Sequence, residues 1–187
     1  MPMNLLEDLP SDSGVTFELR SDLRPGDLGA LVALHGTVYA RECGFDSTFE
    51  AHIARHLGEF VQARTDCDQL WIAEWEGRLA GSIAIVSHSE RDAQLCWLLV
   101  DPPARSVGLG KRLLHEAVAF CRRCSYEYVF LRSFSGLTIA SRLFQSVGFE
   151  KVEERPSERW GVVVVAEWYV LHPFRRRHPS PNELASS

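Results

Sequence analysis

Residues 97–118 read WLLVDPPARSVGLGKRLLHEAV, and this stretch decides the fold. Its first four residues continue an apolar run from Gln94, which predicts a central strand buried on both faces. Pro102 and Pro103 end that strand, because proline cannot donate to a ladder of strand hydrogen bonds. Apolar residues at helical spacing predict a helix over residues 110–123. The segment between strand and helix is therefore a strand–loop–helix junction.

The junction has the composition of an anion-binding loop. Gly108 and Gly110 let the backbone approach a ligand closely, because no Cβ stands in the way. The first N–H groups of a helix lack intrahelical acceptors and carry partial positive charge. We therefore predict that residues 105–111 bind an anion, to which Arg105 and Lys111 add full charges. The spacing is neither that of a Walker loop nor that of a dinucleotide fingerprint, which needs a third glycine three residues after Gly110.

Length and composition restrict the class of protein. The chain has 187 residues, 45% of them hydrophobic, and a net charge of −5. This size and apolar content predict one packed domain and exclude general disorder. A nucleic-acid binder is normally basic, so we expect no nucleic-acid partner. We find no apolar run long enough to span a membrane and no signal-peptide pattern at the N-terminus, so we expect no membrane partner and a cytoplasmic location.

Changes in composition along the chain predict its organisation. Residues 1–14 and 173–187 are polar and aperiodic and predict flexible tails around a domain over residues 15–172. Hydrophobic periodicity within the domain predicts, in order, a strand over 15–20, helices over 22–39 and 49–63, strands over 69–75, 79–86 and 94–100, a helix over 110–123, a strand over 128–132, a helix over 138–147, and strands over 149–154 and 162–171. This order is that of a mixed α/β (α+β) domain rather than a regular β-α-β alternation.

The cysteines do not predict a metal or redox site. Cys121 and Cys124 form a CxxC pair within the predicted helix over 110–123 and just beyond it. A structural zinc site needs four ligands, and no second CxxC or close histidine pair is present. A redox pair is activated at a helix N-terminus, whereas this pair lies near the other end. We expect buried or half-buried thiols and no metal.

Two linked motifs resemble those of a known family. RSVGLGK (105–111), after a strand ending in VDP, resembles the RxxGxG/A pyrophosphate motif of the GNAT (N-acetyltransferase) superfamily. ASRLFQSVGF (140–149) resembles that family's AxxLYxxxGF segment, and the likeness extends over about residues 16–172. It implies a mixed, mostly antiparallel central sheet flanked by helices, with a splayed strand pair at the cofactor site. It also implies acetyl-CoA as co-substrate and transfer of an acetyl group to a primary amine of a small molecule or peptide.

The resemblance also implies which residues bind the cofactor. In the family, the splayed strand pairs with the pantetheine arm, the loop amides hold the pyrophosphate, and the helix of the second motif lines the other wall. The corresponding residues are Leu98, Leu99, Val100, Arg105, Ser106, Val107, Gly108, Leu109, Gly110, Lys111, Ala140, Leu143 and Phe144.

The catalytic groups depart from the family pattern. Phe144 stands where many members have the tyrosine that protonates the leaving thiolate, and Gln94 stands near the place of a frequent glutamate base. His35, Glu42 and Glu50, in the helices that roof the acceptor site in this family, are the candidate bases. Other candidates are His52 and His88. A non-catalytic acyl-CoA-binding sensor is the alternative function, because it needs the loop but not the missing groups.

The acceptor and the assembly are less well defined. Glu42, Asp46 and Glu50 would attract a cationic amine, although a solvated helix face accounts for them better. Residues 23–50, 131–137 and 154–161 look like the acetyltransferase domain fused behind MarR-type regulators, but about fifteen residues before the domain leave no room for a winged helix. VVVVAEWYV (162–170) is apolar throughout and needs covering, for which a homodimer is one solution.

Overall fold

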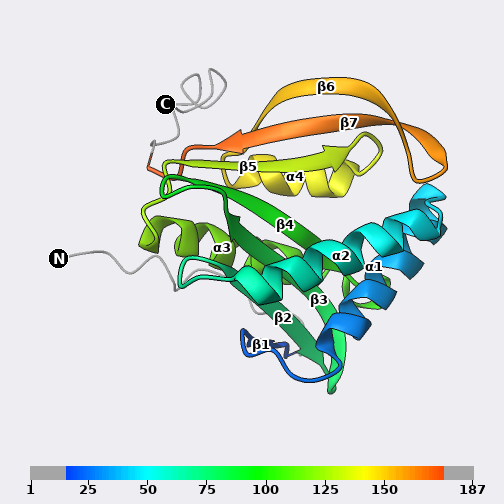
Figure 1. Ribbon diagram of the computed structural model, residues 1–187, viewed down its shortest axis with the longest axis horizontal. Coiled ribbons are helices and arrows are strands. Elements are labelled where there is room, and N and C mark those ends of the chain that lie inside the picture. Colours follow the sequence, from blue (N-terminus) through cyan, green and yellow to red (C-terminus); the bar gives the residue numbers. More distant parts are fainter. Residues whose placement is uncertain (1–15, 175–187) are drawn as a thin grey trace, which may run out of the picture.

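A seven-stranded sheet runs through the computed structural model, which describes residues 16–174 (Figure 1). Its strand order is β1-β2-β3-β4-β5-β7-β6, and each neighbouring pair is antiparallel except β4 and β5. The strands are β1 (Glu18–Arg20), β2 (Gln69–Trp75), β3 (Arg78–Ser87), β4 (Asp92–Val100), β5 (Tyr128–Phe134), β6 (Glu150–Arg159) and β7 (Val162–Leu171). The predicted mixed α/β fold with a mostly antiparallel sheet is confirmed.

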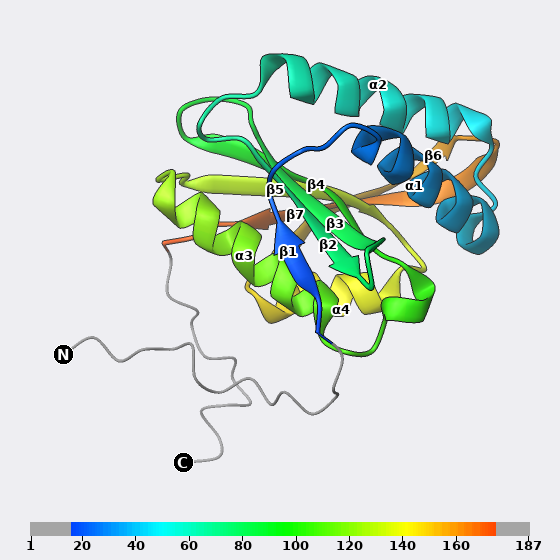
Figure 2. The same ribbon diagram turned by 90° about the horizontal axis from the view of Figure 1, so that it is seen from below.

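Helices cover both faces of the sheet (Figure 2). α1 (Asp27–Cys43) and α2 (Ser47–Ala63) pack on one face, where Leu31, Ile53 and Leu57 are among the buried residues. A short 3₁₀ turn (Pro102–Ala104), α3 (Leu109–Arg123) and α4 (Thr138–Ser146) follow β4 and β5 and contribute to the core on the other face. Both cores are built from the apolar stripes that the sequence shows, so the helices are held mainly by burial of those stripes.

Some predicted boundaries are wrong. α1 begins at Asp27 rather than residue 22, because the Asp27 carboxylate accepts hydrogen bonds from the Arg20 guanidinium and from the Arg24 N–H just before the helix. The predicted tails lie almost entirely outside the described residues. Of the predicted C-terminal tail, only Pro173 and Phe174 are described, and Pro173 is buried.

β4 leaves its neighbour β5 partway along its length. The two strands pair only over residues 92–94 and 128–130, and β4 then turns away from β5 (Figure 1). Trp97, with φ +52°, inserts an extra residue opposite β3, and its carbonyl accepts a hydrogen bond of 2.8 Å from Ser82 Oγ. This bulge increases the local twist. The prediction of a strand buried on both faces is therefore wrong, since Leu95 and Leu99 are buried while the alternate positions are half-buried.

β7 lies inside the sheet. It pairs with β5 on one side and with β6 on the other, so both of its edges are already occupied. The strand's apolar character is explained by this position rather than by a second copy of the chain. A homodimer stays a prediction, without the free strand edge that suggested it. No helix in residues 16–174 is long and apolar enough to cross a membrane.

Candidate active site

The loop before α3 presents a group of unpaired backbone amides. The Arg105 N–H donates to the Pro102 carbonyl, and the Arg112 N–H donates to the Gly108 carbonyl and begins the helix ladder. Between them, no group in the described chain accepts a hydrogen bond from the amides of residues 106–111. Ser106 and Gly108 have φ values of +69° and +83°, the alternation of backbone conformation that turns successive N–H groups to one side. The geometry suits an oxyanion.

The Arg105 side chain is committed to the protein. Its Nε donates to the Val100 carbonyl at 3.1 Å, and its Nη1 lies 2.8 Å from Glu42 Oε1. The guanidinium thus joins the loop to the end of β4 and to the last turn of α1. We expected Arg105 to add a free charge and an N–H to the anion site, but both groups have protein partners. Lys111 is exposed and has no ion pair with any described residue, so it supplies the loop's free cation.

The open edge of β4 offers further backbone groups beside the loop. The Asp101 N–H donates to the Ala80 carbonyl on the β3 side. Because backbone groups alternate in direction along a strand, those of Leu99 also point to β3, while those of Leu98 and Val100 point to the side that β5 has left. Of the three predicted residues, two therefore present main-chain groups to the opening.

α4 packs closely against the start of α3 and the end of β4, next to the amide loop. A Cβ on Gly110 would lie 3.2 Å from Leu143 Cδ2 and 3.6 Å from Val100 Cγ2, so glycine allows α3, α4 and β4 to meet closely. Ala140 is half-buried on the same core. Phe144 is 5% exposed and packs against Tyr169, with ring centroids 5.6 Å apart. No hydroxyl exists at this position.

The three predicted catalytic residues do not form one cluster. His35 is 2% exposed, its Nδ1–H donates to the Leu31 carbonyl, and its Nε2 has no hydrogen-bond partner. Burial lowers the pKa of His35 to about 4, so the ring is neutral. Glu50 is exposed and lies over Gly36, where a Cβ would come within 2.7 Å of its Oε2. Only Glu42 touches the amide loop, through Arg105.

A residue that we did not predict faces the same opening. Arg132 lies on β5 two residues beyond Phe130, where the pairing with β4 ends. Its positive charge opposes the strong rise in the pKa of the Cys96 thiol on β4, which burial raises to about 12. The sequence signal was a charged residue placed at strand spacing between Phe130 and Phe134.

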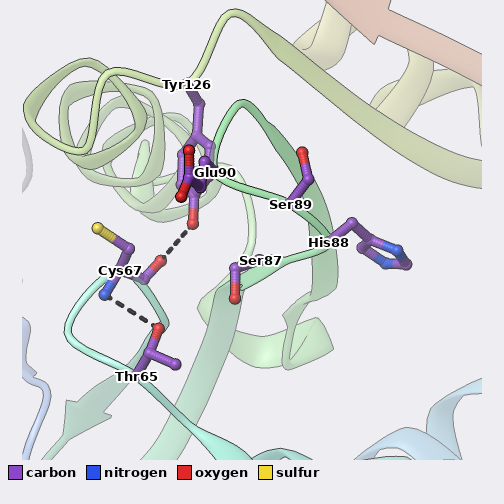
Figure 3. A pocket seen from close by; sticks show the side chains of 7 residues that line it. All are labelled: Thr65, Cys67, Ser87, His88, Ser89, Glu90 and Tyr126. Atoms are coloured by element: carbon purple, nitrogen blue, oxygen red, sulfur yellow. Dashed lines mark hydrogen bonds between the residues drawn. The ribbon is translucent and has the colours of Figure 1, made fainter.

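A separate pocket lies at the other end of α3 (Figure 3). Thr65, Cys67, Tyr126 and residues 87–90 line it, and the Tyr126 hydroxyl donates to the Cys67 carbonyl at 2.9 Å. α3 has 15 residues, which span about 22 Å, so the pocket and the amide loop are at opposite ends of one helix. His88, one of the other base candidates, lines this pocket and is therefore remote from the loop.

The CxxC pair is as expected from its place in the helix. Cys121 is buried and Cys124 half-buried at the C-terminal end of α3, and burial raises the pKa of both thiols to about 12. Both are therefore protonated thiols at neutral pH. Within residues 16–174, no group of three or more His, Cys, Asp or Glu side chains is arranged to hold a metal ion.

Comparisons with known proteins agree with this geometry. Residues 36–149 match the model of the Acetyltransferase (GNAT) family. N-acetyltransferase 8 and N-acetyltransferase 8B of Homo sapiens are 30% and 29% identical over 97 and 99 residues. These matches cover 49% and 50% of this chain but only 42% and 44% of the two relatives.

Solved structures share the fold at low identity. The putative acetyltransferase yncA from Salmonella typhimurium, crystallised with its cofactor acetyl-CoA, has a TM-score of 0.70 at 16% identity, over 88% of this chain and 98% of its own. Ribosomal-protein-alanine N-acetyltransferase from Brucella melitensis has a TM-score of 0.67 at 19% identity, over 83% and 99%. At these identities the likeness establishes the fold alone.

Proposed function

Since the chain belongs to the acetyltransferase (GNAT) family, we propose that it is an acetyl-CoA-dependent N-acetyltransferase that acts on a primary amine by direct attack within a ternary complex. The observation that carries this proposal is the run of unpaired amides over residues 106–111, beside the open edge of β4. An acetyl-CoA-bound structure of similar fold supports the choice of co-substrate.

The residues present fit acetyl-CoA. Six N–H groups and the Lys111 ammonium suit a pyrophosphate, and Gly108 and Gly110 leave room for its close approach. On β4, the Val100 carbonyl already accepts from Arg105. The Leu98 N–H and C=O and the Val100 N–H therefore remain for the amide groups of the pantetheine arm. When bound, acetyl-CoA supplies the activated acetyl group.

Proton removal from the amine falls to Glu42 acting through water. Its Oε1 forms an ion pair with Arg105 Nη1 at 2.8 Å, no described residue forms a hydrogen bond or ion pair with its Oε2, and the side chain is 36% exposed. His35 is a poorer base, since its low pKa gives it little affinity for a proton and it is buried in the core. Glu50 lies against α1 and has no contact with the loop.

Release of the CoA thiolate and transfer of the acetyl group need little from the protein. Phe144 has no proton to give, but a thiol with a pKa of about 8.5 is an adequate leaving group without an acid. Cys96 of β4 packs against the core beneath α1 and α2, and burial raises its pKa to about 12, so it is protonated and a poor nucleophile. This favours direct transfer to the amine over an acetyl-cysteine intermediate.

A non-catalytic acyl-CoA sensor is the second candidate, favoured by the burial of Phe144 and by the neutral Gln94. Calorimetric titration with acetyl-CoA, followed by thiol-release assays with a panel of amines, separates the two. Binding with turnover supports the transferase, binding without turnover for any amine supports the sensor, and absence of binding refutes both. The likeness to the domain fused behind MarR-type regulators and the cytoplasmic location stay predictions.

A further inference from the structure

One face of the β5–β7–β6 half of the sheet carries three arginines. Residues directly opposite each other in a sheet share a face. Arg132 pairs with Trp168, Arg155 with Ala166, and Arg159 with Val162. The three β7 residues lie at even spacing and so point the same way, which places all three arginines on one face. Phe134, Val162 and Val164 of that face pack in the core beneath α1 and α2, so this is the α1–α2 side.

The arginine face also carries Glu150 and Glu153, opposite Val170 and Trp168, but no described residue forms an ion pair with Arg132. Arg132 forms no hydrogen bond or ion pair with any described residue. Arg159 forms no ion pair with any described residue, and its guanidinium lies 5.9 Å from the centre of the Trp160 ring. Arg155 stacks over Trp168 at 4.6 Å and has one weak partner, Glu153 at 3.7 Å.

The acidic residues of the roof have local roles instead. Glu42 pairs with Arg105, and the Asp46 carboxylate caps α2 by accepting from the Thr48 N–H. Glu50 lies against Gly36. None of these three carboxylates forms an ion pair with Arg132, Arg155 or Arg159 in the described chain.

His52 on α2 packs beside Trp160, with ring centroids 5.5 Å apart. Burial lowers the pKa of His52 to about 4, and the charges of Arg159 and Arg132 lower it further alongside its neighbours His56 and Arg55. A neutral imidazole adds no charge to the arginine face.

Of the three arginines on this face, Arg132 is the one on β5, the strand beside the opening of β4. It lies on the part of β5 that has separated from β4, and its charge acts on Cys96, just before the bulge at Trp97. The β6–β7 turn closes the far end, where the Asp46 N–H donates to the Trp160 carbonyl at 3.0 Å. An acceptor entering from the α1–α2 side must therefore pass an unpaired guanidinium.

We propose that the acceptor amine carries its own anionic group, a carboxylate or a phosphate, and that Arg132 binds this group. A guanidinium offers paired N–H donors that match either oxyanion. A molecule with both an amino and an acidic group would be held by Arg132 with its amine directed to the opening of β4. The Trp168 ring lies between Arg132 and Arg155 and supplies an apolar surface for the carbon skeleton. This inference rests on the proposed function and specifies its acceptor.

The test compares amines that carry an anionic group with related amines that lack it. Acetyl-CoA binding is first confirmed by calorimetry, and turnover is then measured for glycine and glutamate against their amides, for O-phosphoethanolamine against ethanolamine, and for spermidine. We expect kcat/KM to be at least about tenfold higher for the anionic member of one pair. In the Arg132→Gln variant, kcat/KM should fall about ten- to hundredfold for that anionic amine and stay unchanged for its partner. The pair that responds distinguishes carboxylate from phosphate. Arg78→Gln, an exposed arginine at the β2–β3 turn, is the matched control and should change neither value.

Each other outcome is decisive. Equal turnover of charged and uncharged amines, preference for spermidine, or an equal loss for both members of a pair in Arg132→Gln overturns the inference and leaves the transferase function intact. If acetyl-CoA binds but no amine turns over, calorimetric binding of the same amines to the CoA-loaded protein gives the answer, and the absence of a charge preference overturns the inference. If acetyl-CoA does not bind, the proposed function fails and this inference fails with it.

Discussion

Replacing Lys111 by proline tests the unpaired amides directly. Lys111 is the third residue of α3, and its N–H has no acceptor in the described chain, so Lys111→Pro removes a donor without breaking a hydrogen bond of the free protein. Proline is tolerated in a first helical turn, and the preceding Gly110 has no Cβ to clash with the ring. Lys111→Ala is the reference, because it removes the charge but keeps the N–H. The unfolding free energies of the two variants should agree within about 1 kcal/mol.

The binding of acetyl-CoA should differ much more. A hydrogen bond to a charged group contributes about 1.5–3 kcal/mol, so Lys111→Pro should have a Kd for acetyl-CoA about 10- to 150-fold above that of Lys111→Ala, measured by calorimetry. At the neighbouring position 112, proline should instead lower the stability of the fold. The Arg112 N–H donates to the Gly108 carbonyl at 3.0 Å, so Arg112→Pro should lose about 3 kcal/mol of stability relative to Arg112→Ala. Equal Kd values for the two Lys111 variants, or destabilisation of Lys111→Pro as large as that of Arg112→Pro, would refute the reasoning.

Four other predictions follow from the same geometry. Gly81→Ala should lower the unfolding free energy by about 1–3 kcal/mol in urea denaturation, because its Cβ would lie 2.8 Å from a β4 carbonyl oxygen, and an unchanged midpoint contradicts this. Glu42→Gln should lower kcat about a hundredfold while destabilising the fold by less than about 1 kcal/mol, since the Arg105 pair is about one-third exposed, and Glu50→Gln should keep kcat. The pKa of His35 falls from 6.5 to about 4 on folding, so the unfolded chain binds more protons between these values, and stability should decrease by up to about 3 kcal/mol as the pH falls through this range. That slope should vanish in His35→Gln, and its persistence counts against a buried neutral ring. Mass spectrometry after incubation with acetyl-CoA alone should detect no acetylated Cys96, and a stable adduct there would argue for a covalent route.

The link between Glu42 and Arg105 connects two parts of the proposed site. Glu42 belongs to the helix that roofs the acceptor side, and Arg105 to the loop that presents the amides. Because Arg105 also donates to the end of β4, the two sides of the site share one guanidinium. A change in either partner is therefore expected to affect both acetyl-CoA affinity and amine turnover.

The sequence by itself determined the order of the elements and the strand–loop–helix junction. Alternation and helical spacing are local properties, and the glycines and prolines of residues 102–110 punctuate them clearly. The same local information, together with the second motif at 140–149, indicated the family before any contact was known. These features depend on neighbours along the chain, which is why they could be predicted.

Tertiary structure alone decided which groups are free and which are engaged. Periodicity placed His35 on the first helix and the resemblance pointed to Glu42, but neither could show that His35 is buried and that Glu42 meets Arg105. No glycine or proline marks the bulge at Trp97. Arg132 lies beside an opening because the pairing of β5 with β4 ends at Phe130, which the sequence does not show. These outcomes depend on surfaces that are distant in sequence and meet only when the sheet is assembled, and a one-residue change of register would alter them all.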